Sequence, residues 1–181
     1  MKKIDCDEIM RVLVRCILGR QPLEPVIIES FHKLADRCVL FEIYRRNSFL
    51  VCEIVAGIPE GEHNIGLIDL LEKHPDIQEA ARHKKMMTIF NPSQNPLTHY
   101  FSGIIQTKNI RQIVYLPLLA KDFVAGMIAI DFCGEEKDRE EDFLNYCFRR
   151  LEESISRVLS SEDVCLDLKQ RWVPEFVPRR R

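Results

Sequence analysis

The sequence predicts an α+β fold in which a central antiparallel β-sheet is accompanied by helices at both ends of the chain. Two pairs of apolar segments predict β-hairpins, because each pair is rich in valine, isoleucine and phenylalanine and is split by a short polar turn. Segments near both ends instead repeat apolar side chains at three- and four-residue steps, which is the period of a helix. Adjacent hairpins favour an antiparallel sheet, and the helices must cover one of its faces.

The N-terminal part of the chain predicts two helices. Residues 4–18 carry apolar side chains at helical spacing, and the acidic side chains near their start suit a helix N-terminus. Residues 24–36 show the same spacing, with Pro25 in the first turn. Gly19 and Pro22 separate the two helices.

The hydrophobic period changes after the second helix. Residues 38–44 and 49–56 predict the first hairpin, with a polar turn at 45–48. Three glycines and a proline punctuate residues 57–66, which predicts a loop.

A long middle segment, 57–109, separates the two hairpins. Within it we expect short helices at 65–73 and 77–84, a brief strand at 87–90 and a further short helix near 98–105. A segment of this length is too long for a simple connection, and long excursions between strands commonly form lids or pocket walls.

Residues 112–120 and 123–132 predict the second hairpin, and their alternation separates two kinds of side chain. One face is uniformly aliphatic and should carry the terminal helices. The other mixes small, aromatic and charged groups, which is typical of a pocket floor. The aliphatic face carries Val114, Leu116, Leu118, Ile128 and Ile130, and the mixed face carries Ile113, Tyr115, Met127, Ala129 and Asp131.

A long helix at 136–159 is expected to close the domain, because its apolar positions repeat helically. We therefore predict a single domain over residues 1–160, with a helix at each end. Residues 161–181 form a C-terminal tail, whose last sixteen positions hold five basic and two acidic side chains. Such a tail could bind an acidic partner or pack on its own domain.

Three segments resemble the GAF domain, a small-molecule-sensing regulatory module of signalling proteins. Residues 36–43 are similar to the family's first core strand, and residues 56–66 are similar to the turn after its second. The hairpin at 113–131 is similar to another family motif, with a Pro-Leu pair at 117–118 and Gly126 in place. The resemblance implies a GAF-like fold with terminal helices on one face of the sheet and a ligand pocket on the other.

The resemblance covers about residues 24–159 and implies where a small molecule would bind. In GAF domains that bind a ligand, the site lies on the mixed face, beneath short helices and loops of the middle segment. It does not identify the ligand or any cofactor. The implied ligand-binding residues are Phe41, Ile43, Cys52, Ile54, Leu67, Phe90, Tyr100, Phe101, Tyr115, Met127, Ala129 and Asp131.

Asp131 is the most informative of these residues. A carboxylate among apolar strand residues must pair with another group or reach water. Because Asp131 also lies near the end of its predicted strand, a capping or exposed role and a ligand contact both remain open.

These observations lead us to expect a sensory or regulatory domain without catalytic activity, which binds an unidentified small molecule and signals through its terminal helices. The apolar surface of residues 4–18 exceeds what one helix face needs, which suits either a homodimer interface or a cover formed by the tail around Trp172 and Phe176. We expect a homodimer through the terminal helices, and a downstream signalling protein is a further expected partner. One alternative is an interaction module that dimerises while its own side chains fill the pocket. Another is a thiol enzyme similar to the reductases of free methionine sulfoxide, in which Cys52 and Cys133 would be candidates.

Composition and short motifs further limit the classes of function that we expect. The chain has 181 residues with a formal charge of −2, so the strongly basic face of a nucleic-acid-coating protein is not expected. No apolar stretch approaches the length of a membrane span, and no secretory signal is predicted. Seven cysteines without a CxxC pair predict reduced thiols in the cytoplasm. Five scattered histidines do not predict a metal site, and no catalytic motif is present.

Overall fold

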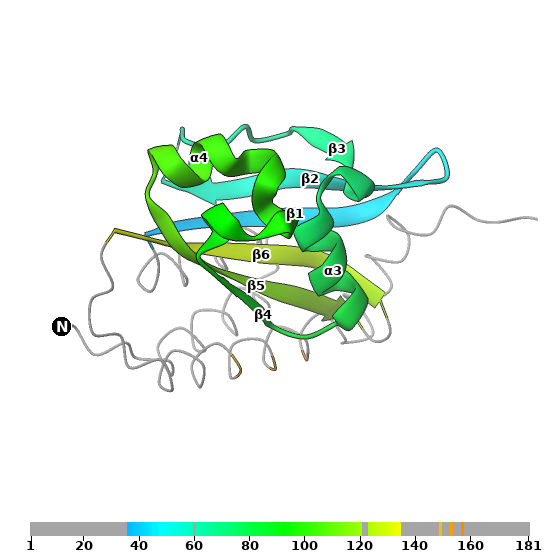
Figure 1. Ribbon diagram of the computed structural model, residues 1–181. Coiled ribbons are helices and arrows are strands. Elements are labelled where there is room, and N and C mark those ends of the chain that lie inside the picture. The colour runs from blue at the N-terminus through cyan, green and yellow to red at the C-terminus, as the bar shows by residue number, and fades with distance from the viewer. Residues whose placement is uncertain are drawn as a thin grey trace, which may run out of the picture.

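The computed structural model describes residues 36–59, 61–120 and 123–134, together with Arg149, Glu153 and Arg157. Its strands form one antiparallel sheet in the order β3-β2-β1-β6-β5-β4 (Figure 1). The central antiparallel sheet predicted from the two hairpins is therefore confirmed. The strands are β1 (Arg37–Arg46), β2 (Phe49–Ile58), β3 (Ile68–Leu70), β4 (Met87–Phe90), β5 (Ile110–Ala120) and β6 (Phe123–Cys133).

The predicted helices at 4–18 and 24–36 and the tail at 161–181 lie outside the residues that the structure describes. The same holds for most of the predicted helix at 136–159, in which Arg149, Glu153 and Arg157 are helical and exposed. Positions four residues apart share one side of a helix, so these three charged side chains suit the side away from the predicted apolar stripe.

The hairpin of β1 and β2 turns on two residues, Asn47 and Ser48, which have φ angles of 49° and 73°. Positive φ at both central positions matches the right-handed twist of the flanking strands, which favours this turn in hairpins. The sequence prediction placed Arg45 and Arg46 in the turn, but both lie in β1 and pair with β2. The tight turn leaves them free to extend the ladder.

The hairpin of β5 and β6 is confirmed and is slightly longer than predicted at its open end. Gly126 has a steric reason to be glycine, because a Cβ atom there would lie 2.6 Å from the carbonyl oxygen of Phe41 in β1. Pro117 has no N–H for a ladder, and β4 pairs with β5 only as far as Tyr115. Pro117 therefore lies beyond the stretch of β5 that has strands on both sides.

The predicted helix at 65–73 is wrong. Ile68–Leu70 forms edge strand β3, which pairs with Val51–Glu53 of β2, and only Leu71–Lys73 is helical, as the 3₁₀ helix η1. Gly66 has a φ of +83°, which a right-handed helix does not allow. Pairing with an existing strand outweighs the weak helical period of so short a segment.

The other short helices of the middle segment form where they are predicted, with changed bounds. The helix α3 (Pro75–His83) begins at a proline, which suits a first helical position. The strand at 87–90 is confirmed as β4. In place of one helix at 98–105, the chain forms the 3₁₀ helices η2 (Pro92–Gln94) and η3 (Pro96–Phe101) and then α4 (Ser102–Thr107).

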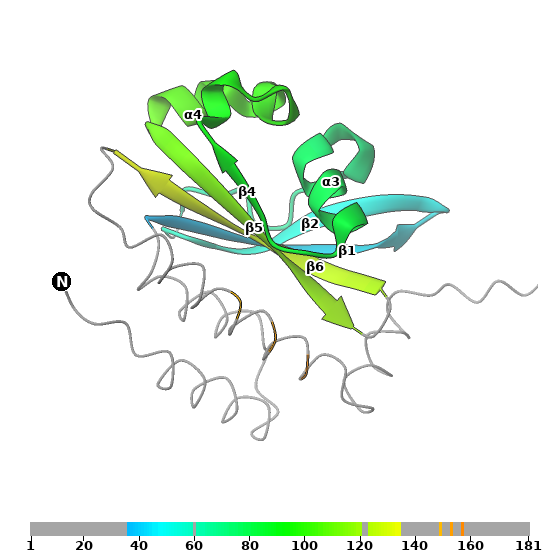
Figure 2. The same ribbon diagram turned by 60° about the horizontal axis from the view of Figure 1, so that its bottom comes forward.

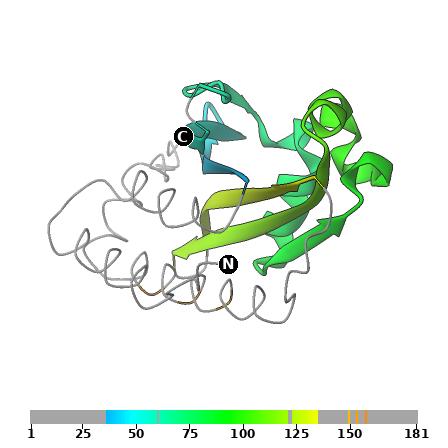
Figure 3. The same cartoon turned by 90° about the vertical axis from the view of Figure 1, so that its left-hand side faces the viewer.

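The helices α3 and α4 cover the same face of the sheet (Figures 2 and 3). We call α3, η2, η3 and α4 the lid. Ile77 and Ala80 of α3 and Ile105 of α4 belong to one buried cluster with Ile113 and Tyr115 of the sheet. No helix in the described part of the chain is long and apolar enough to cross a membrane.

Candidate functional site

Strand register brings most of the predicted site residues to one face of the sheet. Directly opposite residues of an antiparallel pair share a face. Tyr115 lies opposite Ala129, and its hydroxyl donates a hydrogen bond to Asp76 at the start of α3, so this face is the one that the lid covers. We call it the lid face. It carries the predicted sheet residues Phe41, Ile43, Cys52, Ile54, Tyr115, Met127, Ala129 and Asp131.

The residues predicted from the middle segment are placed less uniformly. Leu67 lies in the loop before β3 and is exposed, while Tyr100 and Phe101 lie in η3 with their ring centroids 4.6 Å apart. Phe90 needs a correction, because it is 52% exposed and alternation in β4 turns it away from the lid face. Its neighbour Ile89, which lies opposite Ile113, is the buried residue on that face.

A hydrogen-bonded cluster joins the sheet to α3 around Asp76. Tyr115 and Tyr100 both donate to this carboxylate, the latter over 2.8 Å, and Nδ1 of His74 lies 3.0 Å from the Tyr100 hydroxyl. Burial raises the pKa of Asp76, although the two hydroxyl donors oppose this shift. Burial also raises the pKa of Tyr115, so the hydroxyl keeps the proton that it donates.

The His74 ring has an unusual environment at the edge of this cluster. Tyr100 uses its only hydroxyl proton in the hydrogen bond to Asp76, so its oxygen can accept a hydrogen bond from Nδ1–H of His74. Nε2 is buried without a hydrogen-bond partner, 3.7 Å from a carboxylate oxygen of Asp69. Burial lowers the pKa of His74, which favours the neutral ring.

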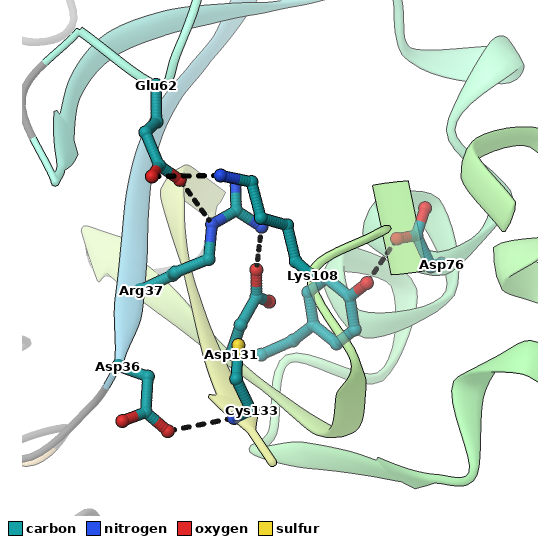
Figure 4. Close-up of polar contacts among 8 residues, drawn as sticks. Asp36, Arg37, Glu62, Asp76, Lys108, Asp131 and Cys133 are labelled. Atoms are coloured by element: carbon teal, nitrogen blue, oxygen red, sulfur yellow. Dashed lines mark hydrogen bonds and ion pairs between the residues drawn. The ribbon is translucent and has the colours of Figure 1, made fainter. Parts of the chain in front are cut away.

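A second polar cluster lies at the rim of the lid face, where charged groups from four segments form a chain (Figure 4). Arg37, the first residue of β1, donates from Nη1 to Asp131 over 2.8 Å and from Nε to Glu62 over 3.3 Å. Nζ of Lys108, just after α4, lies 2.9 Å from the other carboxylate oxygen of Glu62. We call these four residues the rim cluster.

The structure excludes one of the two roles considered for Asp131. The side chain is buried and paired with Arg37, so the capping or exposed role is wrong. Burial raises the pKa of Asp131 to about 6, against the attraction of the Arg37 guanidinium. In Glu62, by contrast, the hydrogen bond from Lys108 leads the effects that lower the pKa.

Several solved structures with a similar fold are GAF domains. The chain matches the phycocyanobilin-bound GAF domain from a cyanobacterial phytochrome with a TM-score of 0.67 at 12% identity, covering 91% of this chain and 98% of that one. It matches the GAF domain of an Acinetobacter phosphoenolpyruvate-protein phosphotransferase with a TM-score of 0.64 at 14% identity, covering 84% and 91% of the two chains. The chain has a GAF-like fold.

A third GAF structure, from a two-component sensor histidine kinase of Bacillus halodurans, matches with a TM-score of 0.53 at 16% identity, covering 81% of this chain and 96% of that one. No protein-family model matches the sequence, and no curated protein matches it. The resemblance of the two hairpins to the GAF pattern is therefore confirmed at the level of the fold.

Several polar residues of this GAF-like domain were not among the predicted site residues. Arg37 stands two positions before Val39, so alternation puts both on the lid face, and the buried carboxylate of Asp131 needed a cation. The need of the Asp131 carboxylate for a cationic partner is the feature of the sequence that pointed to Arg37. Asp76 had a similar signal, because a tyrosine in an apolar strand, Tyr115, requires a partner for its hydroxyl.

Thiol chemistry finds little support at Cys52, one of the two cysteines considered for it. Burial raises the pKa of Cys52 to about 12, and burial also raises the pKa of Cys38. The nucleophilic thiolate is therefore scarce at neutral pH in both residues. Among the residues that the structure describes, no three histidine, cysteine or acidic side chains are grouped as a metal ion would need.

Proposed function

We propose that this chain is a sensory or regulatory domain that binds a small molecule on its lid face and has no catalytic activity of its own. The observation that carries the proposal is the hydrogen bond from Tyr115 to Asp76, which joins the centre of the sheet to α3. A molecule between sheet and lid must rearrange this bond, so its binding changes the position of α3. The rim cluster offers charged groups that can orient such a ligand.

The proposed output runs through the terminal helices at 4–18 and 136–159 to a homodimer interface or a downstream signalling protein in the cytoplasm. Its support is the fold shared with GAF domains of a sensor histidine kinase and a phosphotransferase. Coupling requires that the ligand bind one arrangement of the helices more tightly than another. Size-exclusion chromatography with light scattering, with and without ligand, measures the dimer directly.

Native mass spectrometry tests the proposal, recorded gently and then after denaturation. A small-molecule mass that the folded protein retains and the denatured protein loses is the expected result. Tyr115→Trp removes the donor to Asp76 and enlarges the ring, so this variant should lose the retained mass. Tyr44→Trp is the matched control, because Tyr44 lies on the other face of β1. Equal retention by both variants contradicts a site on the lid face.

A second candidate is an interaction module whose lid face is filled by its own side chains. The observation that favours it is the burial of Tyr115 and Met127, which are 2% and 0% exposed. This candidate predicts a protein that dimerises, carries no retained mass and gains no thermal stability in a screen of metabolites. Stabilisation by any small molecule, lost in Tyr115→Trp but kept in Tyr44→Trp, favours the sensor instead.

A further inference from the structure

The carboxylate of Glu62 is held in the rim cluster as a bound organic acid would be held. Its two oxygens have separate cationic partners: Nε of Arg37 lies 3.3 Å from Oε2, and Nζ of Lys108 lies 2.9 Å from Oε1. The Arg37 side chain is only 9% exposed, whereas Glu62 and Lys108 are 32% and 39% exposed. The carboxylate therefore lies where solvent meets the rim of the lid face.

The Arg37 guanidinium is held in place without help from Glu62. Asp131 accepts a 2.8 Å hydrogen bond from Nη1 of Arg37, which fixes the guanidinium from the sheet side. Lys108 is the first residue after α4, so the lid sets the position of the Lys108 backbone. Without Glu62, the remaining rim residues carry two positive charges and one negative charge. The place of the Glu62 carboxylate therefore attracts one further anion.

Glu62 lies beside a glycine in the loop between β2 and β3. Residues 61–67 belong to the loop that connects β2 to β3, and Gly61 has a φ of +81°, a conformation that glycine adopts without strain. The end of the loop next to β3 is bonded to the sheet, because the N–H of Gly66 donates to the carbonyl oxygen of Ile54 in β2 over 2.7 Å. At its start the loop is closed by a longer backbone hydrogen bond, in which the N–H of Glu62 donates to the carbonyl oxygen of Pro59 over 3.3 Å.

We propose that Arg37 and Lys108 form a binding site for the carboxylate of a small organic acid, and that Glu62 occupies this site until the ligand displaces it. The inference rests on the proposed function, because it names the ligand class for the same face. Planar carboxylates suit the site, since each cation serves one oxygen. A tethered carboxylate competes at an effective concentration of about millimolar, so the wild type binds the acid less tightly than a variant without the Glu62 carboxylate, and it releases the loop when it does.

The test uses the full chain, with sodium acetate as the probe. Binding is followed by ¹⁵N NMR at the side-chain Nε–H of Arg37, which reports on the proposed contact itself. Glu62→Gln removes the competing charge at nearly constant shape and should bind acetate at least about tenfold more tightly than the wild type. Glu62→Ala should show the same gain, because it removes the carboxylate without leaving an amide to bind Arg37. Glu79→Gln, on the exposed side of α3, is the matched control and should show no gain.

Further titrations separate the carboxylate site from general anion attraction. Adding Lys108→Met to Glu62→Gln should abolish the gain, and acetamide or sodium chloride at equal concentration should not replace acetate. Unchanged acetate affinity in folded Glu62→Gln and Glu62→Ala overturns the proposal. An equal response to chloride, or a response to phosphate alone, overturns its carboxylate assignment. A retained compound without an acidic group in wild-type native spectra overturns the ligand class while supporting the sensor function. Failure of the sensor function has a different signature, because no small molecule is then retained by the wild type.

Discussion

The lid is joined to the sheet at two places that differ in their chemistry. At α3, the carboxylate of Asp76 accepts two tyrosine hydroxyls, and one of them, from Tyr115, is deeply buried. At the other end, Lys108 pairs with Glu62, which in turn binds Arg37 of β1, and the side chains of Lys108 and Glu62 are partly exposed. Water and salt weaken exposed ion pairs, whereas buried hydrogen bonds are protected from both.

This difference assigns distinct roles to the two attachments. The Asp76 cluster holds the lid in place, because breaking it leaves a buried polar group without a partner. The exposed half of the rim cluster consists of Glu62 and Lys108. It can exchange one carboxylate for another at little cost in free energy. The buried half, which pairs Arg37 with Asp131, anchors the exchangeable part to the sheet. The following variants break or sharpen this comparison, beginning with the largest expected effect.

Replacing Arg37 by methionine should cause the largest loss of stability. The change leaves Asp131 buried without its cation, and removing one partner of a buried ion pair costs about 3 kcal/mol or more. Denaturant unfolding at pH 7 measures the loss. The double variant Arg37→Met/Asp131→Leu should recover most of it, because well-packed apolar residues can replace a buried pair. A double variant as unstable as the single one shows that the pair is not the cause.

Removing the hydroxyl of Tyr115 should have the next largest effect. Tyr115→Phe deletes a buried hydrogen bond to a carboxylate, which is worth about 2 kcal/mol. The matched control is Tyr44→Phe, which deletes a 2.8 Å hydrogen bond to Glu53 near the surface and should cost under about 0.5 kcal/mol. Equal losses in the two variants contradict the special role of the α3 attachment.

The α3 attachment also shows what the sequence could predict. Alternation in the second hairpin correctly assigned Tyr115 and Asp131 to one face, because that pattern depends only on neighbouring residues. The partners of both were not predictable in the same way. Asp76 is 39 positions from Tyr115, and Arg37 is 94 positions from Asp131, so only the tertiary fold brings them together.

The edge strand β3 was missed for a related reason. Its three residues are too few for their alternation to predict a strand, and pairing with β2 determines their conformation. The brief strand β4 was predicted, but the side to which Phe90 points was not. The face of the sheet to which each side chain of so short a strand points is set by the register with β5, in which Ile89 lies opposite Ile113.

Acid should reduce the penalty of the Arg37→Met change. In the folded protein the pKa of Asp131 is about 6, above its ordinary value. The contribution of Asp131 to the free energy of unfolding of the wild type is therefore fully present at low pH and is lost as the pH rises through 6. Removing the Arg37 cation raises that pKa further. The deficit of Arg37→Met should therefore shrink by about 1 kcal/mol from pH 7 to pH 5. Denaturant unfolding at both pH values measures this change, and a constant deficit shows that Asp131 does not titrate in this range.

The smallest effect is expected for the exposed half of the rim cluster. Lys108→Gln removes the ion pair with Glu62 and should lower the melting temperature slightly at low salt. In about 1 M sodium chloride the screening length falls to about 3 Å, so the difference from the wild type should disappear. Lys85→Gln makes the same charge change at an exposed position after α3 and controls for net charge. A loss that persists in high salt means that Lys108 holds the lid by packing, and the rim then cannot exchange Glu62 for a ligand as easily as its exposure suggests.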